Sequence, residues 1–230
     1  MTEENKTKEI CYLCGKSIEK GQLSYDHVPP IAFYPKDIRD GLNLQVAPSH
    51  RECNEDYRKD EEYFLHVLYV EVLKQRPPII SHLEKDFSRR AKKPQTPAMI
   101  RKILSGFSNV TPGGIYLPQG IFQVKLDQLR IRRVVFKIAR GLFYIENKSY
   151  LPLENAKDIR FCVKGDNVPE LYRVYWPAVK LSGVYPKVFS YKYFNSCKYS
   201  VSSKYPGLEF HLFTLLFWEA VMFCVTFEKP

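Results

Sequence analysis

The chain has 230 residues, of which 45% are hydrophobic and 14% aromatic, and its formal net charge is +10. This length is enough for one good core and a smaller module but not for three ordinary domains, and the composition excludes general disorder. The charge is uneven, because residues 1–64 hold 9 Lys+Arg and 13 Asp+Glu, a net of −4, which leaves +14 for the rest. We therefore expect residues 65–230, the rear of the chain, to bind any polyanionic partner, although a basic surface also increases solubility.

The six cysteines are spaced like metal ligands and buried thiols rather than like a disulfide framework. Cys11 and Cys14 form a Cys-x2-Cys pair, and His50 and Cys53 form a second pair with the same spacing. Zinc takes four tetrahedral ligands of these types, so we expect a structural Zn²⁺ ion at Cys11, Cys14, His50 and Cys53. A redox-active Cys-x2-Cys motif is the alternative, and it leaves the second pair unexplained.

The segment between the two pairs predicts two short strands. We expect the first strand at 23–27, because Pro29 and Pro30 cannot continue a ladder. We expect the second at 42–46, after a loop that closes at Gly41.

A helix is predicted to follow the second strand. Ser49 has the character of a helix N-cap, and Glu52 three residues later would complete a capping box. The helix is expected to run from His50 into Leu73 and to end before Pro77. Apolar residues at helical spacing in its second half predict that this half packs against the rear of the chain.

The rear of the chain predicts helices followed by strands. Residues 79–105 have a helical pattern that Pro94 and Pro97 interrupt, and they carry many Lys and Arg residues. Residues 126–144 predict an amphipathic helix. From Arg160 onward, alternating aromatic and aliphatic residues predict an antiparallel sheet.

Residues 210–227 are apolar enough to raise the question of a membrane span. The run contains His211 and Glu219 and is rich in aromatic and β-branched residues. We interpret it as two buried strands divided at Trp218-Glu219, with a membrane helix as the alternative. Residues 1–10 lack the apolar run of a signal peptide, so together with the free thiols they predict a cytoplasmic protein without membrane contact.

Two groups of side chains in the rear are candidates for contact with nucleic acid. One face of the helix at 126–144 carries a stripe of cations that could follow a phosphate backbone. Tyrosines of the predicted sheet could stack on bases. The alternatives are an ordinary solvated helix face and an ordinary sheet core. The residues are Arg130, Arg133, Lys137 and Arg140 in the stripe, and Tyr185, Tyr191, Tyr193 and Tyr199 in the sheet.

Asp26 and His27, at the end of the first predicted strand, are candidates for phosphodiester hydrolysis. A histidine can take a proton from water near neutral pH, and an adjacent carboxylate can hold Mg²⁺ against a phosphate. The amide of Asn54, directly after Cys53, could complete that metal site, and Asn43 could orient His27. The alternative for Asp26 and His27 alone is a surface or local hydrogen-bonding role, and a turn or capping role is the favoured interpretation of either asparagine alone.

Together these residues resemble a known family. The run Cys-x2-Cys … Asp-His-Val-Pro … Asn-Leu … His-x2-Cys-Asn is similar to the HNH endonucleases, whose ββα-metal fold is braced by zinc. The resemblance covers the first quarter to third of the chain. It implies that His27 is the general base, that Asp26 and Asn54 bind the catalytic Mg²⁺ or Mn²⁺, and that Asn43 is the orienting residue. Two departures are that a histidine opens the second zinc pair and that an asparagine replaces the frequent final histidine.

These expectations define the predicted protein as a whole. The fold class is α+β, with a zinc-stapled HNH module in residues 1–76 and a basic region of helices and antiparallel strands in residues 77–230, for nucleic-acid binding or regulation. The expected function is metal-dependent cleavage of double-stranded DNA, with restriction or anti-phage defence by analogy and homodimers as one possible state. The alternative is a non-catalytic zinc protein that binds nucleic acid.

Overall fold

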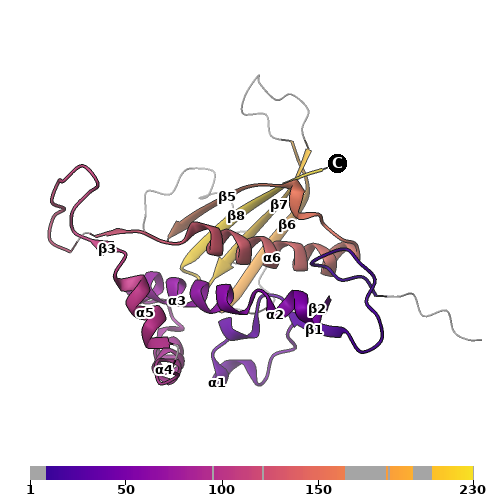
Figure 1. The fold of residues 1–230 in the computed structure, drawn as a ribbon, viewed down its shortest axis with the longest axis horizontal. Helices are drawn as coiled ribbons and strands as arrows, with labels where there is room; N and C mark the ends of the chain where they lie inside the picture. The colour runs from indigo at the N-terminus through magenta and orange to yellow at the C-terminus, as the bar shows by residue number, and fades with distance from the viewer. Residues whose placement is uncertain are drawn as a thin grey trace, which may run out of the picture.

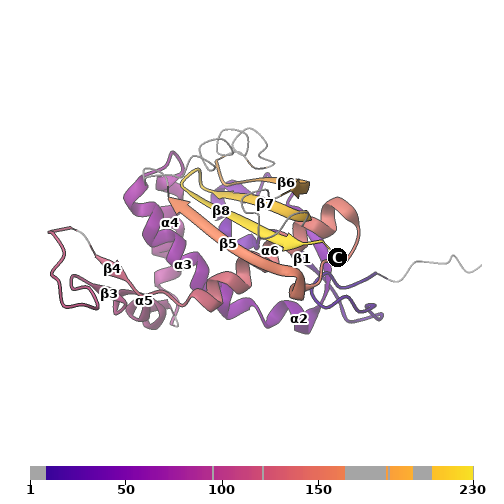
Figure 2. The same ribbon diagram turned by 90° about the horizontal axis from the view of Figure 1, so that it is seen from above.

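In the computed structural model, the described residues are 9–94, 96–120, 122–163, 185, 187–198 and 209–229. They form an α+β architecture in which a layer of helices lies against one face of a four-stranded antiparallel sheet (Figure 1). Figure 2 shows the same arrangement from above, with the strands crossing over α3 and α6. The predicted fold class of mixed helices and antiparallel strands is confirmed.

The N-terminal part contains a two-stranded ribbon followed by helices. Strand β1 (Leu23–His27) pairs antiparallel with β2 (Val46–His50), and the loop between them holds the short helices η1 (Ile31–Phe33) and α1 (Lys36–Arg39). Helix α2 (Arg51–Glu55) follows β2 directly. The first predicted strand is therefore confirmed.

The second predicted strand, at 42–46, is wrong by four residues at each end. Leu42 and Leu44 do pack against the core, but they do so from a loop. The strand begins at Val46 instead and includes Pro48, whose carbonyl accepts a hydrogen bond from Tyr12 N at 3.1 Å. This shift places His50 at the end of β2 rather than inside a helix.

The predicted capping box at Ser49 is also wrong. Ser49 lies in β2, where its hydroxyl donates to the carbonyl of Ser24 at 3.2 Å. His50 is the N-cap residue of α2 and makes no side-chain capping hydrogen bond. The backbone of Ser49 pairs with Ser24 in the β1–β2 ribbon, so its side chain is not placed to cap α2.

The predicted long helix is present in two pieces. Helix α2 ends at Glu55, and after a turn α3 (Arg58–Gln75) continues to the expected end before Pro77. Arg76 closes α3 in the left-handed conformation, with φ of 41°.

The rear helices follow the predicted order. The segment predicted to be helical but interrupted forms α4 (Ile80–Ala91) and α5 (Thr96–Leu104). Pro97 does not interrupt a helix, because it lies in the first turn of α5, where its missing N–H is not needed. A small hairpin, β3 (Phe107–Ser108) and β4 (Gln123–Val124), leads to α6 (Gln128–Asn147).

The sheet closes the chain. After the short helix η2 (Leu153–Asn155) come β5 (Ala156–Val163), β6 (Phe189–Lys198), β7 (Glu209–Phe217) and β8 (Val221–Glu228). Their order is β5-β8-β7-β6, and all neighbours are antiparallel.

The long apolar run near the C-terminus is the β7–β8 hairpin. Its turn contains Trp218 and Glu219, both in the left-handed region with φ of 52° and 55°. The indole N–H of Trp218 donates to the carbonyl of Phe33 at 3.1 Å, and its ring stacks on Tyr69 of α3. The turn is therefore anchored in the interior. No helix in the described part of the chain is long and apolar enough to cross a membrane.

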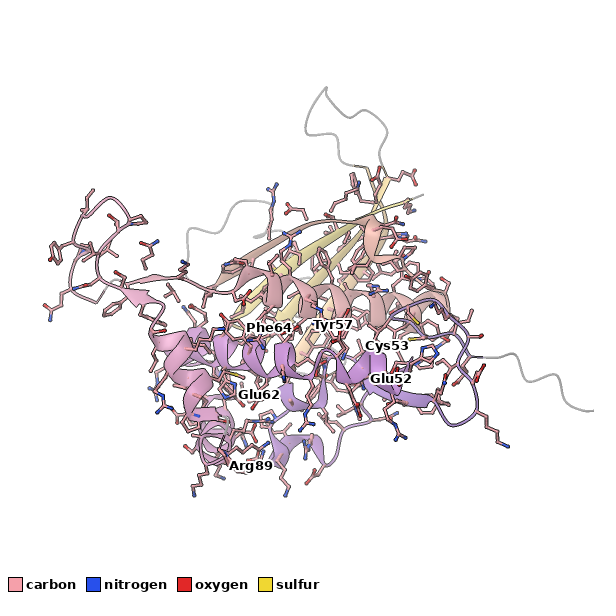
Figure 3. The ribbon with its side chains drawn as sticks, viewed as in Figure 1. Glu52, Cys53, Tyr57, Glu62, Phe64 and Arg89 are labelled. Atoms are coloured by element: carbon pink, nitrogen blue, oxygen red, sulfur yellow. The ribbon has the colours of Figure 1, made fainter. Side chains whose placement is uncertain are left out.

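One hydrophobic core joins the two expected regions. Phe64 of α3 contacts the rings of Phe217 and Phe223 from the sheet, while Glu62 points away from the sheet (Figure 3). Phe136 of α6 packs on Phe227 of β8. The boundary expected at residue 76 falls at the end of α3, and the core continues across it.

A close approach between α6 and the N-terminal module occurs at Gly141. A methyl group there would lie 2.6 Å from a side-chain carbon of Val28 and 3.3 Å from the ring of Tyr12. Val28 and Tyr12 are both buried, so neither can give way easily.

We predict that Gly141→Ala destabilises the protein, although alanine is normally the better helix former by about 0.5–1 kcal/mol. Overpacking at this contact should lower the free energy of unfolding by about 1–3 kcal/mol, measured by urea denaturation. Gly113→Ala is the control, because only the Thr111 hydroxyl lies near the added methyl, at 3.9 Å. Equal stability of Gly141→Ala and the wild type would contradict the packing described.

Candidate functional site

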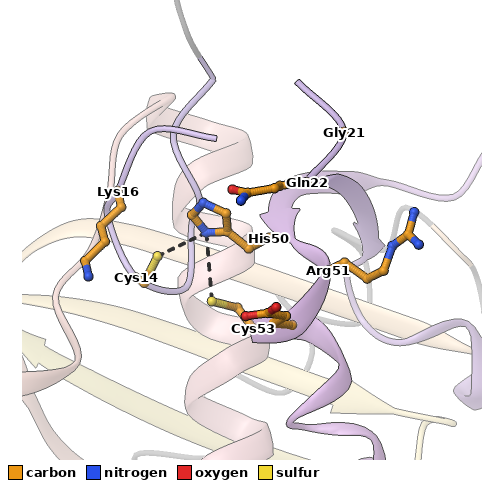
Figure 4. Close-up of a pocket in the computed structure, with 8 residues that line it drawn as sticks. Cys14, Lys16, Gly21, Gln22, His50, Arg51 and Cys53 are labelled. Atoms are coloured by element: carbon orange, nitrogen blue, oxygen red, sulfur yellow. Dashed lines mark hydrogen bonds between the residues drawn. The ribbon is translucent and has the colours of Figure 1, made fainter. Parts of the chain in front are cut away.

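Four predicted zinc ligands come together in the structure. The ligand atoms of Cys11, Cys14, His50 and Cys53 all lie within 4.8 Å of one another. His50 Nδ1 is 3.3 Å from Cys14 Sγ and 3.9 Å from Cys53 Sγ (Figure 4). Around a tetrahedral Zn²⁺ ion with bonds of about 2.0–2.3 Å, ligand atoms lie roughly 3.5–3.8 Å apart. The cluster therefore has the composition and spacing to hold a metal such as zinc.

Local backbone structure positions the first two ligands. Gly15 adopts a left-handed φ of 73° and donates its N–H to the Cys11 carbonyl at 2.8 Å, which turns the chain tightly after Cys14. A side chain at Gly15 would meet the ring of Tyr150 at 2.9 Å, so glycine is needed for both the turn and the packing.

The second pair comes from the junction of β2 and α2. His50 ends β2, and Cys53 lies within the first turn of α2, so both face the knuckle formed by Cys11 and Cys14. The other ring nitrogen of His50, Nε2, lies 3.3 Å from the carbonyl of Ser17. A proton on Nε2 would serve this contact and leave Nδ1 as the metal ligand.

The chemistry of the cluster also fits a cation. Burial and the neighbouring Cys11 and Cys14 raise the pKa of the Cys53 thiol to about 12. A zinc ion at the cluster would favour the thiolate form of Cys53, because its positive charge opposes the burial that disfavours ionisation. A pocket of about 450 Å³ opens beside the cluster (Figure 4), and its lining includes Lys16, Gln22, Arg51 and Glu52.

We predict that the purified protein contains one zinc ion per chain and that Cys53→Ala loses it. Structural zinc provides about 10–16 kcal/mol in zinc fingers, so even a loss of ~3 kcal/mol would lower Tm by about 6–12 °C. Elemental analysis and thermal unfolding check this. Cys224→Ala is the control, because Cys224 lies in β8 outside the cluster and its zinc content should be unchanged. A Cys53→Ala protein with full zinc content would contradict the assignment.

A second pocket gathers three of the four predicted catalytic residues. Asp26 and His27 at the end of β1 and Asn54 of α2 line a space of about 220 Å³. Arg58 and Glu61 from the start of α3 line it as well, and neither was singled out from the sequence.

His27 has the properties of a base in this pocket. It is half-buried, and burial lowers its pKa below the ordinary value of 6.5, with Arg39 acting in the same direction. The charge of Asp26 opposes this shift but does not cancel it. His27 is therefore neutral near pH 7 and able to accept a proton.

Asp26 is buried and held by two partners. The hydroxyl of Tyr12 donates to Asp26 Oδ2, and Lys137 Nζ of α6 lies 2.7 Å from the same oxygen. Burial and the charge of Asp26 raise the pKa of Tyr12 well above its usual range, so Tyr12 remains a donor. Sequence reasoning identified the carboxylate of Asp26 but missed Tyr12.

Lys137 does not lie on the surface as the predicted stripe requires. It is 1% exposed, and its ammonium donates to Asn54 Oδ1 at 3.0 Å and to Glu61 Oε1, in addition to its contact with Asp26. Burial raises the pKa of Glu61, and the charge of Lys137 opposes this. An ammonium group therefore lies at the position between Asp26 and Asn54 where the predicted Mg²⁺ would bind.

The other stripe residues also face the protein. Arg130 pairs with Asp60 at 2.6 Å, and Arg133 pairs with Asp60 at 2.6 Å and with Asp56. Arg140 is 1% exposed and donates to two buried backbone carbonyls. Part of the charge asymmetry of the sequence is thus internal, because the acidic front and the basic helix α6 neutralise each other.

Asn43 and the tyrosines lie elsewhere than expected. Asn43 is exposed in a loop, and its carbonyl accepts a hydrogen bond from Tyr185 at 2.7 Å, so the structure does not bring its side chain to His27. Tyr185 and Tyr191 are buried, and Tyr193 contacts His211 at 2.9 Å. Burial excludes base stacking on Tyr185 and Tyr191, and Tyr199 lies outside the described residues.

Comparison of the chain with protein-family models, curated proteins and solved structures found no match.

Proposed function

We propose that this protein is an endonuclease that hydrolyses phosphodiester bonds in double-stranded DNA. The observation that supports the proposal is the meeting of Asp26, His27 and Asn54 at one pocket, beside a Cys/His cluster suited to zinc. The order of these residues is also the basis of the resemblance to HNH endonucleases. A role in restriction or anti-phage defence follows by analogy with that family.

In the proposed reaction His27 takes the proton from the attacking water. Its lowered pKa keeps the ring neutral for this role near pH 7. Arg58 lines the same pocket, and its guanidinium is suited to bind an oxygen of the scissile phosphate. The products would carry 5′-phosphate and 3′-hydroxyl ends.

Asp26 and Asn54 offer the oxygen ligands that Mg²⁺ or Mn²⁺ prefers. Such an ion would supply positive charge to the phosphorane and to the leaving 3′-oxygen. In the present conformation the ammonium of Lys137 contacts both oxygens, so the metal and the ammonium cannot share the position. The proposed reaction can therefore use a metal ion at this position only if Lys137 is displaced.

The second candidate is a non-catalytic zinc protein that binds nucleic acid. It is favoured by the same contact, because Lys137 already neutralises Asp26 and Glu61 without a metal. In that protein the pocket would be a structural ion-pair network, and His27 would have no role in chemistry.

We predict that the purified protein nicks or linearises supercoiled plasmid with Mg²⁺ or Mn²⁺ and that His27→Ala, with matched zinc content, does not. Loss of a general base typically lowers the rate by about 10²–10⁴-fold. His82→Ala is the control, because His82 pairs with Asp37 outside the pocket and its loss should leave cleavage intact. Equal cleavage by wild type and His27→Ala would reject His27 as base, and DNA binding without cleavage would favour the second candidate.

The lowered pKa of His27 also predicts the pH dependence of cleavage. The base is active when neutral, so the rate should rise with pH with a midpoint below the ordinary histidine value of 6.5 and then level off. Single-turnover rates over a pH series at constant ionic strength measure this. A midpoint well above 6.5 would show that another group controls the reaction.

A further inference from the structure

We infer that the ammonium of Lys137 is the resident cation of the site formed by Asp26, Asn54 and Glu61, and that it competes with divalent metal ions for their oxygens. A role for this competition in catalysis rests on the proposed nuclease function. The competition itself follows from the contacts alone and is measurable without any cleavage assay.

The contacts of Lys137 are those of a bound cation. Its ammonium meets two carboxylates and one amide oxygen, which is a ligand set that a hard divalent ion would also accept. The side chain is 1% exposed, so this charge is not shared with water. A metal ion at the same oxygens would lie too close to the ammonium for both positive charges to remain.

The fold keeps Lys137 at this position. The three oxygens belong to β1, α2 and α3, whereas Lys137 belongs to α6. One turn further along α6, Gly141 packs directly against Val28, which follows β1. A metal ion can therefore enter only if the Lys137 side chain swings out or α6 moves away from the ribbon.

Thermal unfolding with and without MnCl₂ tests this competition on zinc-loaded protein. We expect Lys137→Met to be less stable than the wild type, because the buried carboxylate of Asp26 and the partly buried carboxylate of Glu61 are left without their partner. Mn²⁺ should then raise the Tm of Lys137→Met by several degrees and leave the wild type nearly unchanged, since a ligand stabilises only the state that binds it. The double variant Asp26→Asn/Lys137→Met should show no response to Mn²⁺.

Each other outcome overturns the inference. An equal gain in Tm for wild type and Lys137→Met would show that Lys137 does not compete, and no gain in either would show that the oxygens form no metal site. If Lys137→Met does not fold, the comparison moves to wild type and Asp26→Asn, which should respond alike to Mn²⁺. A Mn²⁺ response that depends on Asp26 in the wild type would then reject the inference. None of these results decides the nuclease proposal, which depends on His27→Ala.

A second and independent observation concerns the segment between Asp86 and Asp127. It has no acidic residue but seven Lys and Arg residues. Two of them, Arg89 and Arg90, pair with Asp86. The other five are exposed and have no ion pair among the described residues, and they are Lys92, Lys93, Arg101, Lys102 and Lys125.

The same segment contains a projecting hairpin. The β3–β4 hairpin, with the described loop residues 109–120 and 122, extends away from the helical layer in both views (Figures 1 and 2). Apolar side chains on it are left in solvent, and Ile115, Tyr116 and Phe122 are 68%, 77% and 54% exposed. Just after the hairpin, Asp127 at the start of α6 donates its N–H to the hydroxyl of Tyr63 in α3 at 2.9 Å.

We propose that this basic arm, residues 92–125, binds the nucleic-acid duplex on which the proposed nuclease acts. The five unpaired cations suit phosphate contacts, and the apolar tip suits insertion into a groove. The absence of carboxylates in the segment favours a polyanion over an ordinary protein partner.

Fluorescence anisotropy of a labelled duplex over a salt series tests the basic arm, using His27→Ala protein so that the duplex stays intact. Replacing Lys92, Lys93, Arg101 and Lys102 by Gln should weaken binding and reduce the slope of log K against log[salt] by about 0.9 for each phosphate that the protein no longer neutralises. Tyr116→Ser should weaken binding without changing that slope. Lys148→Gln is the control, because Lys148 is an exposed cation at the end of α6, outside the arm.

An unchanged affinity and slope in the fourfold variant would overturn the assignment of the arm to nucleic acid. Unchanged DNA binding together with an altered oligomeric state in Tyr116→Ser would assign the arm to contact between copies of the chain instead. Both outcomes are distinct from a failure of the nuclease proposal, because the measurement uses protein without the proposed base.

Discussion

The arrangement of β1, α2, α3 and α6 depends on the contacts that the buried ammonium of Lys137 makes. It joins Asp26 of β1, Asn54 of α2 and Glu61 of α3 to helix α6. A charge in the interior is tolerated only when partners surround it, and each carboxylate would be costly there without the ammonium. The pocket at the end of β1 is therefore shaped by a helix that lies 76 or more residues further along the chain than any of the three partners.

The cluster of Cys11, Cys14, His50 and Cys53 lies next in the chain to another residue of the same pocket, Asn54. His50 ends β2 and Cys53 lies in α2, so a metal ion there would hold the angle between strand and helix. Asn54 follows Cys53 directly, and its amide reaches Lys137. Two cationic centres, one a candidate zinc ion and one an ammonium, thus define where the side chains of the pocket point. His27 stands at the rim, half-buried and neutral, where a substrate could reach it.

Local patterns predicted the elements whose signals lie within the segment itself. The x2 spacing of the Cys/His pairs, the prolines after β1 and the apolar face of α6 all have local causes, and the structure bears them out. The shift of β2 and the place of Ser49 could not be predicted, because pairing with β1 decides them. The burial of Lys137 and Arg140 had no local signal either, since α6 is covered on both sides by parts distant in sequence. The acidic residues of α3 near Glu61 were the only hint that Lys137 has internal carboxylate partners.

Anomalous diffraction from crystals of the zinc-loaded protein soaked in MnCl₂ tests the account most directly, because it locates both cationic centres at once. The account predicts a zinc signal among Cys11, Cys14, His50 and Cys53. It also predicts the Lys137 ammonium between Asp26 and Asn54, with no manganese signal there. A manganese signal at those oxygens with Lys137 still in place, or a Lys137 side chain in solvent without any ion at the site, would contradict it.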